Sequence, residues 1–160
     1  MEFSFNKTVG RRTAANGFQD AKIIVDGEYV EGTGGGVCQA STTVYNCALL
    51  ADMRIVEARS HSLPPSYVSP SFDAMVNSGA SDMRFINETG GPVFIKAYGT
   101  DEQAVVEIYG KKPQYKIVRD SVVTSKSAVP LDKTIVDDEG KYVTDDMLPG
   151  DVKRVRYGVA

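Results

Sequence analysis

The sequence predicts an α+β fold in which one central, buried helix packs on an antiparallel sheet, followed by a mostly extended C-terminal stretch. One segment, near residues 38–53, has the apolar spacing of a helix, and short β-rich runs bounded by turn residues stand on both sides of it. From residue 115 onward no long helical pattern occurs. With 42% hydrophobic residues, the 160-residue chain can bury a core.

The first thirty residues are expected to be loop and short strand. Asn16-Gly17 marks a turn, and the β-rich run Ala21–Val25 is ended by Asp26-Gly27. Glu28–Val30 is then the returning strand of a hairpin. The glycine-rich segment Glu31–Gly36 follows, and its composition disfavours a regular helix or strand.

From about Cys38 to Met53 the pattern is helical. Ser41, Thr42 and Thr43 in the first turn can satisfy free backbone donors. Tyr45 and Leu49 make the opposite face partly apolar, which predicts a well-buried helix. The apolar stripe itself, with spacings of three and four, consists of Ala40, Val44, Cys47, Ala48 and Ala51.

Further β-structure is expected after the helix. Arg54–Glu57 is a short strand, and the Pro- and Ser-rich segment His61–Pro70 is an ordered but irregular loop. Turn residues separate three more runs, which predicts an antiparallel meander. These runs are Asp82–Asn87, Pro92–Tyr98 and Ala104–Tyr109, with strand pieces expected at Tyr115–Val118 and Val122–Val123.

The charge pattern gives no footprint for nucleic acid. The net charge is -3, from 18 basic and 21 acidic residues, and the Arg11-Arg12 and Lys111-Lys112 pairs are too small to track phosphates. No apolar run approaches the roughly 20 residues of a membrane span. The N-terminus has no basic start and no apolar signal core, so the chain is either cytosolic or the soluble fragment of a longer protein.

The chain has two cysteines, Cys38 and Cys47, and one histidine, His61. These fall short of the four ligands of a structural zinc site, so we expect no metal and no cofactor. On one helix the two cysteines would lie about 13 Å apart at 1.5 Å per residue, beyond the limit of about 7 Å for a disulfide. Two free thiols with different roles are therefore expected.

A glycine run followed by a cysteine at a helix start is a device that makes a thiol reactive. The helix N-terminus favours a thiolate, and glycine N–H groups at Gly35 and Gly36 can help to form an oxyanion hole. His61 can fold back onto the helix start as the base for Cys38. In the alternative interpretation, Cys38 is a small buried residue and His61 an ordinary surface or core residue. Cys47, on the apolar stripe, is interpreted as core.

The segment Gly34-Gly35-Gly36-Val37-Cys38-Gln39-Ala40-Ser41-Thr42-Thr43-Val44-Tyr45-Asn46 closely resembles the signature of the VanW family. Further motifs follow in the family's order: Ile55-Val56-Glu57, His61-Ser62, Ser66-Tyr67-Val68, Asp73-Ala74 and Asp82–Asn87. The resemblance runs from about Phe3 to Tyr109. Two departures are Ser71-Phe72, where Gly-Arg is expected before the aspartate, and Glu57-Ala58, where Glu-Arg is expected.

The resemblance implies a VanW-like domain over residues 1–112, with 113–160 as an extended linker or the start of a small β module. Some members look like L,D-transpeptidases, which cross-link peptidoglycan stem peptides through a cysteine thioester. Family members are usually tethered outside the membrane, so we expect this domain to work on the wall of a Gram-positive-type cell. The alternatives are a non-catalytic module that binds or scaffolds the wall, and a cysteine endopeptidase of wall peptides.

Beside Cys38 and His61, several residues are candidates for the site, each with an ordinary alternative. Asp73 is the candidate orienter of His61, or a turn residue. Gln39 directly follows the nucleophile, so its backbone N–H is a candidate oxyanion donor; in the ordinary alternative, Gln39 only solvates the helix start. Thr42 contacts substrate or, as we favour, the backbone. Tyr67 lines a peptide cleft or only packs, and Arg59 holds a substrate carboxylate or is solvent-exposed.

Overall fold

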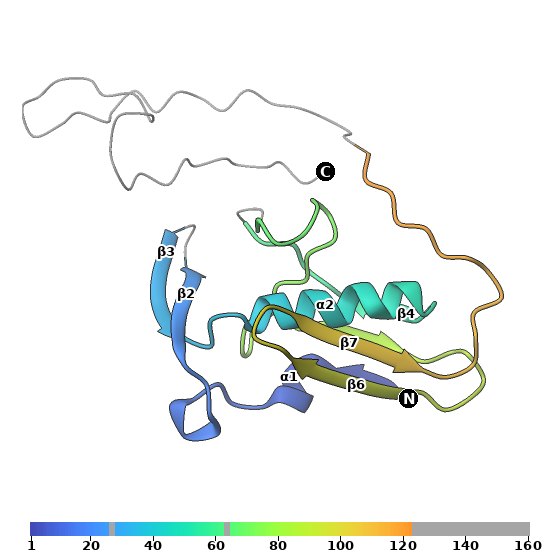
Figure 1. Ribbon diagram of the computed structural model, residues 1–160, viewed down its shortest axis with the longest axis horizontal. Coiled ribbons are helices and arrows are strands. Elements are labelled where there is room, and N and C mark those ends of the chain that lie inside the picture. Colours follow the sequence, from blue (N-terminus) through green and yellow to red (C-terminus); the bar gives the residue numbers. More distant parts are fainter. Residues whose placement is uncertain (26–27, 63–64, 123–160) are drawn as a thin grey trace, which may run out of the picture.

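A computed structural model describes residues 1–25, 28–62 and 65–122 of the chain (Figure 1). The predicted α+β class is confirmed, with one main helix and antiparallel sheets (Figure 1). In chain order the elements are β1 (Glu2–Ser4), α1 (Phe5–Val9), the 3-10 helix η1 (Ala14–Asn16), β2 (Asp20–Val25), β3 (Glu28–Thr33), α2 (Val37–Leu50), β4 (Arg54–Glu57), β5 (Arg84–Ile86), β6 (Phe94–Gly99) and β7 (Ala104–Tyr109).

The strands form three antiparallel sheets, two of which are hairpins. β5 is the centre of a three-stranded sheet, in which Phe85 lies opposite Phe3 of β1 and Ile55 of β4. The predicted hairpin β2–β3 is confirmed. The predicted meander is wrong in one respect, because β6 pairs with β7 and not with β5. Both edges of β5 are already paired with β1 and β4, so no edge is left for β6.

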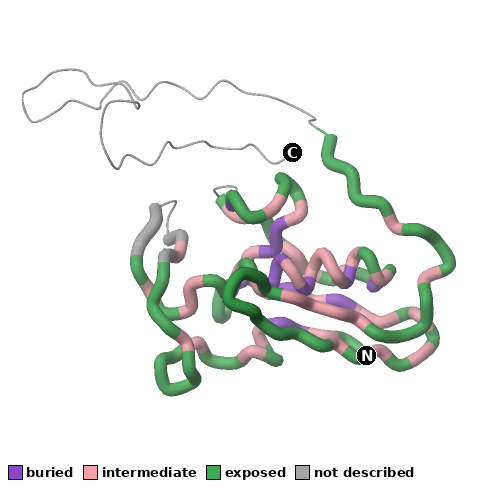
Figure 2. The backbone as a smooth tube through the Cα atoms, in the orientation of Figure 1, coloured by how far each residue is buried: buried purple, intermediate pink, exposed green. Residues whose placement is uncertain are grey.

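Helix α2 begins and ends close to the predicted limits. Asp52 has a positive φ of 59°, and the N–H of Met53 bonds to the carbonyl of Ala48 at 3.0 Å, so the helix ends before Met53. Val44 and Ala48 of the predicted stripe are buried, together with Phe85 of β5 and with Met83, which stands two residues before it. Figure 2 shows these buried segments gathered on α2 and beside it, whereas the described part of hairpin β2–β3 is exposed or half-buried.

Two details of the sequence prediction are wrong. Helix α1 was not expected, because five residues are too few to establish a period; the Ser4 side chain caps it by accepting a hydrogen bond from the N–H of Lys7 at 3.1 Å. Tyr115–Val118 forms no strand. Most of the stretch 113–160, including Val123, lies outside the described residues. Within the described ranges, no helix has the length and apolar character needed to span a bilayer.

Candidate active site

A cavity of about 600 Å³ opens at the N-terminal end of α2. Five separate parts of the chain line it: the segment after α1, the hairpin β2–β3, the glycine turn with the first turn of α2, the loop after β4, and the segment before β5. The lining residues include Arg12, Gly34, Gly36, Cys38, Gln39, His61, Ser66, Tyr67 and Met75–Ser78. The long irregular loop predicted at His61–Pro70 thus folds back over the helix start, and its described residues contain no helix or strand.

The glycine turn fixes the direction in which α2 begins. Gly34 and Gly36 have φ values of +102° and +83°, a backbone region that side-chain-bearing residues rarely adopt. A Cβ atom on Gly35 would lie 2.2 Å from Cβ of Ala21, so this glycine lets the turn pack closely on β2. The turn therefore delivers Cys38 to the first turn of the helix, at the cavity wall.

The Cys38 thiol is half-buried, and its Sγ lies 3.5 Å from the carbonyl oxygen of Val76. Burial alone would raise the pKa of this thiol. Hydrogen bonding to the His61 side chain and to the Val76 backbone, with the positive charges of His61 and Arg12, outweighs burial and lowers the pKa. The environment of Cys38 therefore favours the thiolate, the form that acts as a nucleophile.

His61 is held by Asp73 through two contacts with one carboxylate oxygen. Oδ2 of Asp73 lies 2.7 Å from the ring Nδ1 of His61 and accepts the backbone N–H of His61 at 2.6 Å. The His61 and Asp73 side chains are only 6% and 5% exposed, so solvent screens this pair little. Because Asp73 occupies Nδ1, Nε2 is the ring nitrogen left to serve the thiol.

The charges of this trio support one another. Burial would lower the pKa of His61, but hydrogen bonds to Asp73 and Cys38 and their negative charges raise it to about 9. Burial likewise opposes ionisation of Asp73, and hydrogen bonding to His61 nevertheless lowers the pKa of this carboxyl. A raised imidazole pKa beside a lowered thiol pKa favours a thiolate–imidazolium pair over the neutral pair.

Helix α2 anchors the segment that carries Asp73. Oγ1 of Thr42, a buried side chain, accepts the N–H of Ala74 at 3.0 Å. The hydroxyl of Ser41 donates to the carbonyl of Ala74 as well as to that of Cys38, and the Asn46 amide donates to the Phe72 carbonyl at 2.7 Å. The helix that carries the nucleophile therefore also sets the position of the carboxylate behind the histidine.

Helix α2 also has backbone donors near the thiol. The N–H groups of Val37 and Ala40 bond to the carbonyls of Gly34 and Gly36, at 3.2 and 3.0 Å. Among the described residues, no backbone carbonyl accepts the N–H of Cys38 or Gln39. Free N–H groups at this position can stabilise an oxyanion that develops next to the thiol.

The remaining predicted residues separate into two groups. Gly36, Gln39 and Tyr67 line the cavity, and the Tyr67 ring meets the His61 ring edge-on, with 6.4 Å between centroids. Gly35 packs on Ala21, Thr42 is buried against the backbone, and Arg59 is exposed; none of these three lines the cavity.

Sequence reasoning missed three parts of the wall: Arg12, the segment Met75–Ser78, and the hairpin residues Ile23 and Thr33. The Arg11-Arg12 pair was considered only as a phosphate-tracking patch. Its position in sequence, well ahead of the glycine turn, gives no sign that one arginine lines the same cavity as the thiol. The described residues contain no cluster of three or more His, Cys, Asp or Glu side chains placed to hold a metal ion.

Comparisons with known proteins agree with the residue pattern. Residues 1–109 match the family described as VanW like protein. The uncharacterized protein YoaR of Bacillus subtilis (strain 168) is 42% identical over 107 residues, 67% of this chain and 35% of that protein. The Vancomycin B-type resistance protein VanW of Enterococcus faecalis (strain ATCC 700802 / V583) is 26% identical over 128 residues, 75% of this chain and 46% of that protein. The chain thus spans less than half of either relative, and no solved structure matches it.

Proposed function

The chain belongs to the VanW family, and we propose that it is a cysteine acyltransferase of the L,D-transpeptidase type that acts on peptidoglycan stem peptides. The observation that carries the proposal is the trio at the cavity: Cys38 and His61 line the same wall, His61 lowers the pKa of the thiol, and its Nδ1 lies 2.7 Å from Asp73. A nucleophile, a base and an orienter of that base are the parts that covalent catalysis by a thiol requires.

In the first half-reaction, the Cys38 thiolate attacks the carbonyl carbon of a stem-peptide amide. The carbonyl electrons move onto its oxygen, where the N–H groups of Cys38 and Gln39 stabilise the charge. When the oxyanion collapses, the C–N bond breaks and the His61 imidazolium gives its proton to the leaving amine. A thioester on Cys38 remains, and His61 is neutral.

In the second half-reaction, the amine of another stem peptide attacks the thioester carbonyl. Neutral His61 accepts the proton of that amine, the C–S bond breaks, and Cys38 leaves as the thiolate. Asp73 stabilises the imidazolium in both half-reactions, so the pair returns to its starting charge state. If water replaces the amine, the same steps give hydrolysis, which is the endopeptidase alternative.

The substrate class rests on the family resemblance and on one relative's name as a vancomycin resistance protein. On the same grounds we place the site on the outer side of the cytoplasmic membrane, at the cell wall. A thiol reagent that cannot cross membranes tests this placement when it is applied to intact cells. Labelling of Cys38 in whole cells supports the placement, and labelling only after lysis contradicts it.

The direct test of function is incubation of the protein with purified muropeptides, followed by mass spectrometry. The proposal predicts a thioester adduct on Cys38, none in Cys38→Ser, and an unchanged adduct in Cys47→Ala. New cross-links that require an acceptor stem indicate transfer. Products in which water has replaced the leaving amine, giving a free carboxyl group, indicate hydrolysis. If Cys38 alkylates rapidly but no adduct forms, the acyltransferase proposal is contradicted and the non-catalytic wall-binding alternative is favoured.

A further inference from the structure

We propose that Arg12 is a specificity-determining residue of this cavity and binds a carboxylate group of the acyl-donor peptide beside the Cys38 thiol. The inference rests on the proposed function and deepens it, because it names the chemical feature of the substrate that the cavity recognises. It also replaces Arg59 as the carboxylate-binding residue, since Arg59 does not line the cavity.

Arg12 shares the cavity wall with Cys38 and His61. Its charge is close enough to the thiol to contribute to the lowered pKa of Cys38. Its side-chain stem packs against the glycine turn, where a Cβ atom on Gly34 would lie 3.5 Å from Cβ of Arg12. The stem of Arg12 therefore lies against the same turn that positions the nucleophile.

The partners of Arg12 are all neutral. Nη1 donates to Oγ of Ser78 at 2.6 Å, and Nη2 donates to Oδ1 of Asn6. Nε is buried and has no hydrogen-bond partner among the described residues. None of the described carboxylates forms an ion pair with Arg12, whereas Arg54 pairs with Glu88 at 2.6 Å and Arg84 with Glu2 at 3.0 Å. A partly buried guanidinium without a counter-charge is suited to an anionic ligand.

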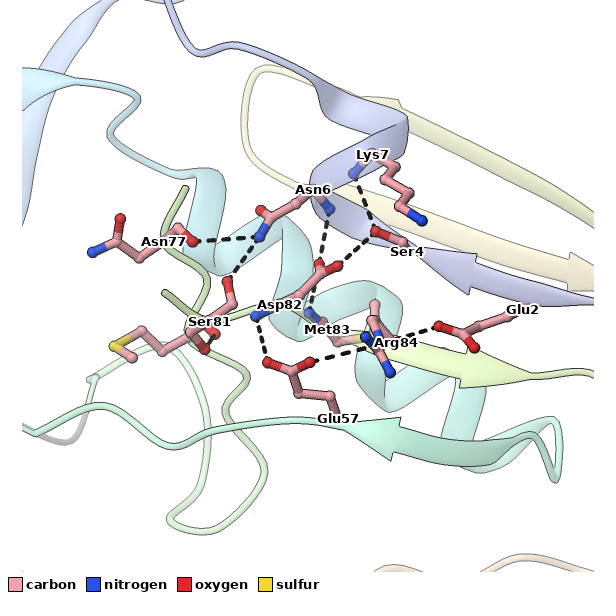
Figure 3. Close-up of polar contacts among 11 residues, drawn as sticks. Glu2, Ser4, Asn6, Lys7, Glu57, Asn77, Ser81, Asp82, Met83 and Arg84 are labelled. Carbon is pink, nitrogen blue, oxygen red and sulfur yellow. Dashed lines mark hydrogen bonds and ion pairs between the residues drawn. The ribbon is translucent and has the colours of Figure 1, made fainter. Parts of the chain in front are cut away.

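A network of hydrogen bonds orients the Asn6 side chain (Figure 3), which in turn accepts from Arg12. The carboxylate of Asp82 accepts the Asn6 N–H at 2.9 Å and the Ser4 hydroxyl at 2.6 Å. The Nδ2 of Asn6 donates to the Ser81 carbonyl at 2.8 Å, so its Oδ1 is the atom left to face Arg12. Through Asn6 of α1, Arg12 is thus linked to Ser4 at the end of β1 and to Asp82, just before β5, which lowers the entropic cost of binding a ligand.

The chemistry of the wall favours a carboxylate over a phosphate. Arg12 and His61 are the only basic residues among those that line the cavity, and His61 is committed to Asp73 and Cys38. A single planar guanidinium fork matches one carboxylate in geometry and charge. The neutral hydroxyl and amide groups beside it, from Ser78 and Asn77, add hydrogen bonds but no second positive charge.

Two small thiol reagents test the inference without any stem peptide. Iodoacetate carries a carboxylate next to the reacting carbon, and iodoacetamide is its neutral counterpart of nearly the same shape. Both would be applied to the intact protein, and mass spectrometry would give the rate at Cys38 and, as an internal reference, at Cys47. Loss of Arg12 alters the thiolate fraction equally for both reagents, so the ratio of the two rates isolates recognition of the carboxylate.

Arg12→Gln is expected to lower the iodoacetate-to-iodoacetamide rate ratio at Cys38 by about fivefold, the loss typical of one partly exposed ion pair. Arg12→Lys should keep part of the ratio, because it retains the charge but loses the fork. Arg11→Gln, the neighbouring arginine that does not line the cavity, should leave the ratio unchanged. Thermal unfolding of each variant verifies that the fold survives.

An unchanged ratio in folded Arg12→Gln, or an equal fall in Arg11→Gln, would overturn the inference. The result is separable from the test of function. If the ratio falls but muropeptides give no thioester, the carboxylate site stands and the proposed stem-peptide activity fails. If the thioester forms while the ratio does not change, the activity stands and the role of Arg12 is refuted.

Discussion

The two ends of helix α2 carry the same side chain in opposite environments. Cys38, in the first turn, faces a cavity beside His61 and Arg12, and its pKa is lowered. Cys47, in the C-terminal half, is half-buried with its Sγ 3.4 Å from the Val106 carbonyl of β7. Burial and the negative charge of Glu107 raise the pKa of Cys47, although a hydrogen bond to the Ile108 backbone opposes them.

This contrast shows that burial alone does not decide the reactivity of a thiol. Burial is the largest influence at both cysteines, and at both it raises the pKa. The difference comes from the partners: a cationic imidazole and guanidinium at Cys38, and a carboxylate at Cys47. Variants that remove His61 or Asp73 should therefore change the reactivity of Cys38 strongly and that of Cys47 little.

His61→Ala should have the largest effect. Without the imidazole, Cys38 loses its base and its main positive partner, and the rate of acyl transfer should fall by about 100-fold or more. Because the His61 side chain is only 6% exposed, the substitution also costs stability. Thermal unfolding and labelling of Cys47 provide the controls. Full activity in folded His61→Ala would refute the role of this base.

Asp73→Asn should have the next largest effect. Removing the carboxylate destabilises the imidazolium, so the pKa of His61 should fall from about 9 toward its usual value near 6.5. The pKa of Cys38 should rise in consequence, and its alkylation at neutral pH should slow by about tenfold for each pKa unit. The pH dependence of alkylation measures both changes. A profile that matches the unsubstituted protein would show that Asp73 does not act through His61.

Thr42→Val should reduce stability more than reactivity. The Thr42 side chain is buried, and its loss would leave the N–H of Ala74 without its acceptor, at a cost of about 1–3 kcal/mol in the free energy of unfolding. Chemical denaturation measures the change. Thr43→Val is the matched control, since among the described residues the Thr43 hydroxyl bonds only to the Gln39 carbonyl of its own helix. Unchanged stability in Thr42→Val, together with lost activity, would favour substrate contact instead.

Cys47→Ala should have the smallest effect. The thiol behaves as a small hydrophobic side chain, so its replacement should cost no more than about 1 kcal/mol and leave the alkylation rate of Cys38 unchanged. Chemical denaturation and alkylation of one preparation measure the free energy of unfolding and the rate at Cys38. A large fall in the rate at Cys38 would mean that the two ends of the helix are coupled.

The sequence predicted the parts of the site that lie near the glycine turn or within a recognisable motif. The glycine turn runs directly into the helix start, His61 is the only histidine of the chain, and Asp73 lies in a family motif. The structure brings Cys38, His61 and Asp73 together. Arg12 escaped prediction because its place depends on a network from Asn6 to Asp82, residues far apart in the chain (Figure 3). Long-range contacts of this kind leave no periodic signal.

In the fold as well, elements with a local sequence pattern were predictable and long-range pairings were not. The hydrophobic stripe predicted α2 because its spacing is local, and Asp26-Gly27 predicted the hairpin β2–β3 for the same reason. The partners of β5 could not be predicted, since β1 and β4 reach it from distant parts of the chain. The short helix α1 depends on its cap at Ser4 and on the carboxylate of Asp82, which sequence spacing does not reveal.

The most direct test of the activated thiol is the rate of iodoacetamide alkylation at each cysteine as a function of pH, resolved by mass spectrometry. Cys38 should titrate below the free-thiol value of about 8.5, and Cys47 above it. In His61→Ala the Cys38 profile should move upward toward that of Cys47, which itself should not change. Equal, slow labelling of both cysteines with one common pH midpoint would contradict the account.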